Sequence, residues 1–543
     1  MIDDDRPDPR DEPGTAAPRP EAVGANLYTA LRAGFPADLD SVAIETADTP
    51  APLRYTWADL ERGSAMLANL LGSLELPAGS RVAVQVDKSV EALMLYLAVL
   101  RAGHVYLPLN TAYQEAEIAY FIGNAEPAAV VCSKRNHGWV ARLAFNAGTK
   151  HVYTLDDDRS GTLLDRAAFH GDTQAPVPVA PADLAAILYT SGTTGRSKGA
   201  MLTHANLLSN AQVLHEAWGW GGVQREGRAD VLIHALPIFH VHGLFVASHA
   251  ALLSGSRMIW FGKFDPKATV ARLPEATVFM GVPTLYVRML GEAALTKAQC
   301  KPMRLFISGS APLLLETFQL WRERTGHTIL ERYGMSETVM LTSNPYRPES
   351  ARRGGTVGPA LPGVGVRVHD DKGRPVATGE IGGIEVKGPN VFKGYWRMPE
   401  KTADEFTTDL WFKTGDVGRI DADGYVTIVG RSKDLIISGG YNVYPAEIEG
   451  FINDMAGVAE SAVVGVPHAD FGEVGVAAVV PKPGATLDPE AIAAALKTRI
   501  ANFKVPKRVF VVPDLPRNAM GKVQKNLLRE QHKGLFADRP RSG

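Results

Sequence analysis

A short stretch of this sequence concentrates side chains that bind phosphate. Residues 189–199 read Tyr-Thr-Ser-Gly-Thr-Thr-Gly-Arg-Ser-Lys-Gly, which joins hydroxyl groups, glycines and two cations in one loop. Glycines let the backbone approach an anion closely, while hydroxyl groups, backbone N–H groups and cations offset its charge. An apolar run over residues 184–188 predicts a buried strand before the loop, and helical periodicity begins near Thr203. We therefore predict a phosphate-binding loop between a strand and a helix.

Two other interpretations of this loop are weaker. Lys198 is followed by Gly199 and the glycine spacing is wrong for a Walker loop, which disfavours a P-loop kinase or GTPase. A plain flexible surface loop is also disfavoured, because linkers rarely lie between two strongly patterned apolar elements.

Composition and charge restrict the class of protein and its partners. A chain of 543 residues, 45% of them hydrophobic, predicts a globular protein of two or more domains. The formal net charge of −2 gives no electrostatic reason to expect nucleic acid or an anionic membrane as a partner. Cys132 and Cys300 lie far apart in the sequence and imply neither a disulfide framework nor a metal site, so we expect a cytoplasmic protein.

The N-terminal segment and the apolar runs exclude several targeting signals. Residues 1–25 are rich in Asp, Pro and Arg and predict a disordered tail. They contain neither the apolar core of a signal peptide nor the composition of a transit peptide. No uninterrupted apolar run reaches the roughly 20 residues that span a bilayer, so we expect no membrane segment.

Strand and helix patterns alternate along most of the chain, which predicts a parallel, doubly wound α/β fold. After about residue 355, short Val- and Ile-rich runs predict a small β-subdomain, and from Arg431 onward a mixed pattern predicts a compact α+β unit. Ligands bind at the carboxyl ends of parallel strands, so we expect several loops to converge on one cleft. These loops are residues 190–198, 238–242, 281–284, 308–312 and 331–337. Single helices are predicted at 243–253, 313–324 and 489–503, among others.

Five motifs, in this order, resemble the adenylate-forming superfamily of acyl-CoA synthetases, peptide-synthetase adenylation domains and firefly luciferases. They are Tyr189–Gly199, Tyr333-Gly-Met-Ser-Glu337, Thr414-Gly-Asp416, Gly430-Arg-Ser-Lys-Asp434 and Pro516-Arg-Asn-Ala-Met-Gly-Lys522. Members activate a carboxylate with ATP to an acyl-adenylate and release diphosphate, and the acyl-CoA synthetases then transfer the acyl group to coenzyme A. The resemblance implies ATP, Mg²⁺ and CoA as ligands. It also implies a large N-terminal domain over residues 26–431 and a small mobile lid over residues 432–543.

The resemblance further implies a role for each motif residue. The implied catalytic residues are Lys198 on the β- and γ-phosphates, Glu337 on Mg²⁺, and Lys522 at the charge that develops between carboxylate and α-phosphate. Asp416, with Arg431 nearby, is expected to accept hydrogen bonds from the ribose, and Tyr333 to stack on adenine. The other implied nucleotide-binding residues are Thr190, which is also expected to approach Mg²⁺, Ser191, Gly192, Thr193, Thr194, Gly195, Gly309, Ser310, Ala311, Glu331, Arg332, Gly334, Met335 and Ser336.

Lys433 lies where this superfamily has a hinge. Rotation of the lid at that residue is expected to remove Lys522 after adenylation and to let CoA reach the adenylate. In relatives the lysine at the Lys522 position can be acetylated as an off-switch, and residues 516–525 are compatible with this modification. The sequence leaves the oligomeric state open.

Two elements predict which acid is activated. The segment 236–243 places His240 and His242 at the acyl-pocket position, and Arg288 follows Thr284 by one helical turn. A buried arginine facing this pocket requires an anionic partner, and the simplest partner is a second carboxylate on the substrate.

Segments 234–244, 280–284, 305–313 and 388–401 also resemble bacterial malonyl-CoA synthetases. We therefore predict malonate as the substrate, with methylmalonate as a second one, and His242, Arg288 and Ser308 as the residues that contact it.

Other interpretations make separable predictions. A CoA ligase for another short-chain monocarboxylic acid has no need of a second carboxylate site, and helical periodicity alone also allows Arg288 to point to solvent. An enzyme that loads a carrier protein does not use free CoA, and a luciferase-like oxidoreductase consumes oxygen. A nucleotide-binding protein without catalysis is disfavoured by the co-occurrence of Glu337, Asp416 and Lys522. A metal site at His240 and His242 is disfavoured because no third ligand stands at a usual spacing.

Overall fold

The computed structural model describes residues 26–49, 51–190, 197–221, 229–438, 441–468, 471–518 and 521–536. The predicted disordered tail, residues 1–25, lies outside these ranges. So do Ser191, Gly192, Thr193, Thr194 and Gly195 of the predicted phosphate-binding loop.

Two large sheets make up the N-terminal part of the chain, and most of their neighbouring strands are parallel. The first contains, in spatial order, β14 (Thr342–Ser343), β13 (Leu330–Tyr333), β12 (Leu305–Ser308), β11 (Val278–Gly281), β9 (Val231–His234), β10 (Arg257–Trp260), β1 (Val42–Thr46) and β2 (Arg54–Thr56). The second contains β17 (Gly394–Tyr395), β8 (Lys198–Thr203), β7 (Leu184–Thr190), β4 (Val105–Pro108), β3 (Arg81–Gln85), β5 (Ala129–Cys132) and β6 (His151–Thr154). The predicted doubly wound α/β class is confirmed.

Helices cover both faces of these sheets and produce three apolar cores. The largest core lies between the sheets and includes residues of α1 (Leu27–Ala33), α2 (Trp57–Ser73), α3 (Val90–Arg101), α6 (Thr162–Ala167), α7 (His204–Ala217) and α9 (His249–Leu253). Outside the first sheet pack α10 (Pro266–Arg272), α11 (Pro283–Leu290) and α12 (Leu315–Thr325), and outside the second α4 (Glu115–Ala125) and α5 (His137–Asn146). Every residue of α3 is buried, as its apolar character on all sides predicts.

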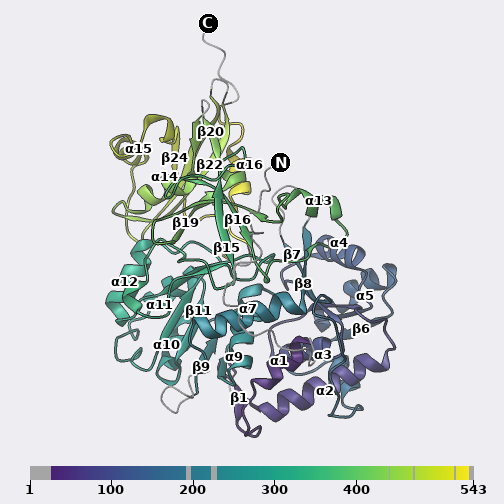
Figure 1. Ribbon diagram of the computed structural model, residues 1–543. Coiled ribbons are helices and arrows are strands. Elements are labelled where there is room, and N and C mark those ends of the chain that lie inside the picture. The colour runs from purple at the N-terminus through teal and green to yellow at the C-terminus, as the bar shows by residue number, and fades with distance from the viewer. Residues whose placement is uncertain are drawn as a thin grey trace, which may run out of the picture.

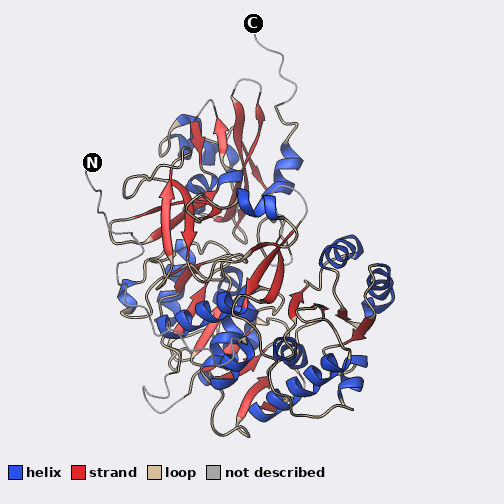
Figure 2. Ribbon diagram, turned by 45° about the vertical axis from the view of Figure 1, so that its right-hand side comes forward, coloured by secondary structure: helices blue, strands red, loops and turns tan. Residues whose placement is uncertain are grey.

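The C-terminal part contains two smaller sheets. One is antiparallel, with β15 (Gly365–His369), β16 (Gly382–Lys387), β18 (Phe412–Ile420) and β19 (Val426–Arg431), and α13 (Pro399–Asp404) precedes β18. The other contains β21 (Tyr441–Val443), β20 (Ile436–Ser438), β23 (Gly472–Pro481), β22 (Val458–His468) and β24 (Arg508–Val511), with α14 (Pro445–Asn453), α15 (Pro489–Lys497) and α16 (Lys525–His532). In Figures 1 and 2 this last unit lies above the two large sheets.

Three predictions about elements are wrong in detail. The predicted phosphate-binding loop joins two antiparallel strands, β7 and β8, and the helix begins only after Thr203, so the loop is not at a helix N-terminus. The strand β8 pairs with β7, and its short apolar run did not by itself predict a strand. The helix predicted at 243–253 starts with a π-helical segment, η2 (His242–Ser248). The helix predicted at 489–503 ends at Lys497, next to Thr498, a residue of low helix propensity.

Within the part of the chain that the structure describes, the helices are too short or too polar to cross a bilayer.

Candidate active site

Asp416 on β18 is the centre of one polar cluster. The residue is 3% exposed, and the register of β18 with β19 places it opposite Arg431. The Arg431 Nε donates to Asp416 Oδ1 at 2.7 Å, and the Tyr333 hydroxyl donates to Oδ2. Burial raises the pKa of Asp416, while Arg431 and Tyr333 favour its ionised form. A carboxylate accepts about four hydrogen bonds, so Asp416 retains acceptor capacity for a pair of ligand hydroxyl groups.

Glu337 is the centre of a second cluster, at the β7–β8 hairpin. The carboxylate is 6% exposed, and the Tyr395 hydroxyl donates to Oε1 at 3.0 Å. The Lys198 ammonium lies 4.2 Å from the centroid of the Tyr395 ring and 3.2 Å from Glu405 Oε1. Burial raises the pKa of Glu337, and Lys198 lowers it. Tyr395 thus contacts both Glu337 and Lys198, and Glu405 contacts Lys198. The sequence singled out neither Tyr395 nor Glu405.

The Glu337 cluster fits a metal that is bound together with a phosphate ligand. Among the described residues, no group of three or more His, Cys, Asp or Glu side chains could hold a metal ion. Mg²⁺ commonly takes one or two carboxylates and completes its shell with water and phosphate oxygens. One buried carboxylate beside a lysine matches that pattern. The Thr190 hydroxyl, at the end of β7, donates to the Lys198 carbonyl oxygen at 3.4 Å.

Lys522 lies where the C-terminal unit approaches α11 of the large sheets. Its side chain is exposed to solvent, and a Cβ atom on the neighbouring Gly521 would lie 3.6 Å from the Thr284 hydroxyl oxygen on α11. The surrounding protein lowers the pKa of Lys522, Arg431 lowers it further, and Asp416 opposes the shift. Arg431 and Asp416 are thus close enough to change the pKa of Lys522, so the lysine lies near the Asp416 cluster.

Further buried polar side chains gather at the carboxyl ends of β9 and β12. His242 is 2% exposed, and its Nδ1 lies 3.4 Å from the Ser310 hydroxyl oxygen. The His242 Nε2 and the fully buried Ser308 hydroxyl have no hydrogen-bond partner among the described residues. Ser310 has a φ of 70°, a strained conformation that is frequent at ligand sites. The loops that begin at residues 238 and 308 converge, as predicted.

Arg332, which the resemblance places among the nucleotide-binding residues, lies beside Gly309 in the group around His242. The residue is 2% exposed, and its guanidinium lies so close to Gly309 that a Cβ there would be 2.4 Å from the Arg332 Cζ. Its Nε and Nη2 have no partner within the described residues. Burial lowers the pKa of Arg332 to about 9, and Arg332 in turn lowers the pKa of His242. A buried cation with free donors is costly unless an anion binds to it.

Arg288 differs from the expectation on which its role was based. It is exposed on α11, where Tyr286 and Met289 face the core, so it is not the buried arginine that the sequence predicted. It shares a helical face with Thr284, the residue beside Gly521, and therefore lies on the side of α11 that is turned toward the C-terminal unit.

The remaining predicted residues occupy the connections around these clusters. The backbone at Gly334 passes so close to Val339 that a Cβ would lie 1.8 Å from the Val339 carbonyl oxygen, which fixes the turn that contains Met335 and Ser336. Glu331 accepts a hydrogen bond from the Leu313 N–H, and burial raises its pKa to about 8. Ala311 follows Ser310 in the loop after β12. Lys433 is exposed in the short turn between β19 and β20.

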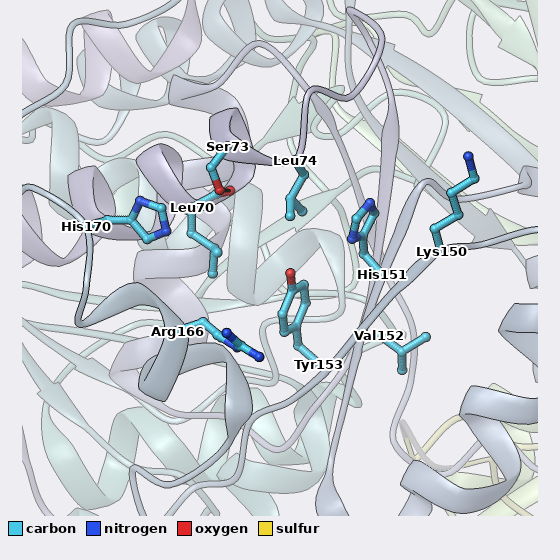
Figure 3. A pocket seen from close by; sticks show the side chains of 9 residues that line it. All are labelled: Leu70, Ser73, Leu74, Lys150, His151, Val152, Tyr153, Arg166 and His170. Carbon is cyan, nitrogen blue, oxygen red and sulfur yellow. Dashed lines mark hydrogen bonds between the residues drawn. The ribbon is translucent and has the colours of Figure 1, made fainter.

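A separate cavity of ≈ 390 Å³ shares none of these residues. It lies beside the edge strand β6, where the Tyr153 hydroxyl points into it and the Arg166 side chain lies at its rim (Figure 3). Its lining consists of Leu70, Ser73, Leu74, Lys150, His151, Val152, Tyr153, Arg166 and His170.

The fold is that of an AMP-binding enzyme, and the chain belongs to that family. The family model described as AMP-binding enzyme matches residues 39–396, and the one described as AMP-binding enzyme C-terminal domain matches residues 447–522.

Relatives within the family carry several substrate names. A malonate–CoA ligase of Arabidopsis thaliana is 35% identical over 493 residues, 84% of this chain and 78% of that protein. A feruloyl-CoA synthase of Amycolatopsis is 36% identical over 483 residues, 88% of this chain and 94% of that protein.

Solved structures of MatB from Rhodopseudomonas palustris are 53% identical to this chain and cover 94% of it and 100% of MatB. The TM-score is 0.90 for the ATP-bound form and 0.80 for the apo form. By this measure the chain is more similar to the ATP-bound form of MatB than to the apo form.

Proposed function

We propose that this enzyme is an ATP-dependent malonyl-CoA synthetase that also accepts methylmalonate. The observation that carries the choice of acid is Arg332. A monocarboxylic acid uses its one carboxylate in the reaction with ATP and leaves no second charge for a buried guanidinium. The second carboxylate of malonate matches the planar fork of the arginine. Ser308 and His242 add buried polar atoms in the same region, and the malonate–CoA ligase and MatB relatives agree with this assignment.

In the first half-reaction, a malonate oxygen attacks the α-phosphorus of ATP, and the bond to the bridging oxygen of the β-phosphate breaks. Lys198 and the hydroxyl groups of the β7–β8 loop bind the departing diphosphate. Asp416 accepts hydrogen bonds from the ribose, and Tyr333 lies against the base. Glu337 would hold Mg²⁺, which would offset phosphate charge. Lys522 donates to the oxygens on which charge develops.

In the second half-reaction, the CoA thiolate attacks the carbonyl carbon of the malonyl-adenylate, and AMP leaves. Lys522 must vacate the cleft for this step, and we propose the exposed turn at Lys433 as the hinge. We therefore also propose CoA as a substrate, Mg²⁺ as a bound ion, and a division of the chain into a domain over residues 26–431 and a lid over residues 432–543.

A substrate panel tests the assignment. We expect diphosphate release with malonate to exceed that with propionate, acetate or ferulate at equal concentration, and malonyl-CoA to form only when free CoA is present. A higher kcat/KM for propionate would replace malonate by a monocarboxylic acid, and adenylate formation without thioester formation would indicate an enzyme that loads a carrier protein.

Arg288→Ala is expected to lower kcat/KM for malonate by about tenfold, because a charged hydrogen bond contributes about 1.5–3 kcal/mol and solvent reduces its strength at an exposed site. Diphosphate release at subsaturating malonate measures the effect. Arg322→Ala, on the neighbouring helix α12, is the matched control and should leave the value unchanged. Equal values for the two variants would exclude Arg288 from substrate binding.

Tyr395→Phe is expected to raise the Mg²⁺ concentration that gives half-maximal activity by about tenfold or more, because the variant loses the hydrogen bond that orients Glu337. A Mg²⁺ titration at fixed ATP measures this, with Tyr153→Phe in the remote cavity as control. An unchanged Mg²⁺ requirement would mean that Tyr395 does not act through Glu337.

A further inference from the structure

Lys88, in the connection between β3 and α3, is a lysine whose three donors are all used inside the protein. Its Nζ lies 2.9 Å from the His234 Nδ1, 2.8 Å from the His234 carbonyl oxygen and 2.8 Å from the Phe261 carbonyl oxygen. The ammonium also lies 4.2 Å from the ring centroid of Trp260. Lys88 follows β3 of the second sheet. Its partners belong to the first sheet: His234 is the last residue of β9, and Phe261 follows β10. Lys88 therefore joins the two sheets.

This contact determines the tautomer of His234. Burial lowers the pKa of Lys88, but the three acceptors around its Nζ favour the ammonium form. An ammonium group has donors only, so the His234 Nδ1 accepts from Lys88, and in the neutral ring the proton then resides on Nε2. Burial and Lys88 together lower the pKa of His234, which keeps the ring neutral. The Nε2–H faces the Gly243 carbonyl oxygen at 3.0 Å, and the Ser248 hydroxyl donates to the same oxygen at 2.9 Å.

Gly243 is the residue after His242, and its position allows little displacement. A Cβ on Gly243 would lie 2.1 Å from the Pro237 carbonyl oxygen, so the chain folds tightly back on itself there. The π-helical segment η2 begins at His242. The hydrogen bonds from His234 and Ser248 hold the first turn of η2, and with it the His242 ring, at the end of β9.

We propose that Lys88 is a positioning residue for acid selection: through His234 it fixes the Gly243 carbonyl, the first turn of η2 and therefore the His242 ring in the acid pocket. The three acceptors of the Lys88 ammonium belong to neither the Asp416 cluster nor the Glu337 cluster, so we expect its loss to affect the acid more than ATP. The inference rests on the proposed function, because it takes His242 as part of the acid pocket.

The test compares KM values for the two substrates. Lys88→Met is expected to raise KM for malonate by about tenfold, consistent with one lost charged hydrogen bond, and to leave KM for ATP within about twofold. His234→Leu should give the same pattern. His234→Gln, whose amide can still donate to Gly243, should stay close to wild type. The double variant Lys88→Met/His234→Leu should have a KM for malonate no higher than that of either single variant, since both substitutions break the same series of contacts from Lys88 through His234 to Gly243.

Several outcomes would overturn the inference. They are an unchanged KM for malonate in folded Lys88→Met, an equal rise in both KM values, or additive effects in the double variant. If Lys88→Met does not fold by circular dichroism, the His234→Gln and His234→Leu pair decides the question. Failure of the wild type to use malonate would overturn the proposed function instead, and the same variants would then be measured with the preferred acid of the panel.

Discussion

Lys522→Ala is expected to lower the rate of malonyl-adenylate formation by about a hundred- to a thousandfold, the usual effect of removing one donor at a site of developing charge. The variant should still convert supplied malonyl-adenylate and CoA to malonyl-CoA, because Lys522 leaves the cleft before that step. The two half-reactions are measured separately, by malonate-dependent exchange of diphosphate into ATP and by thioester formation from the adenylate.

A matched control separates this role from a general effect of charge. Lys533→Ala removes another exposed lysine of the C-terminal unit, one that pairs with Glu530 of α16, and should change neither half-reaction. If Lys522→Ala loses both half-reactions equally, the lysine supports the structure of the lid. If it loses neither, the adenylation role is wrong.

Arg332→Leu is expected to lower kcat/KM for malonate by about a hundred- to a thousandfold, because loss of one partner of a buried charge pair costs about 3–5 kcal/mol. The physical reason lies in the burial of the guanidinium and in its two donors without partners among the described residues. The same reason predicts an opposite effect on stability. Without substrate, replacement of an unpaired buried charge by an apolar side chain should leave the thermal unfolding midpoint unchanged or raise it.

The combination of the two measurements is diagnostic. Steady-state kinetics with malonate and propionate should show a shift of preference toward propionate, and calorimetry should show no loss of stability. A fall in both malonate turnover and the unfolding midpoint would indicate that Arg332 is structural. A value of kcat/KM within about threefold of wild type would move the choice of acid to Arg288 or His242.

The sequence alone determined the family and most elements of this protein. Hydroxyl, glycine and lysine residues in the loop 189–199 are a local pattern, and so is the order of the motifs that contain Glu337, Asp416 and Lys522. Apolar periodicity is local as well, and it located α12 to within two residues. Such features depend on residues close together in the chain, and a sequence displays them directly.

Only the tertiary structure decided which arginine is buried. Arg288 and Arg332 both stand near motifs in the sequence, but the direction of a side chain depends on sheet register and helix orientation. Sheet register and helix orientation place Arg332 against Gly309 and leave Arg288 in solvent. The contacts of Tyr395 with Glu337 and of Lys88 with His234 join residues 58 and 146 positions apart. No local pattern encodes such pairs, because packing of distant elements creates them.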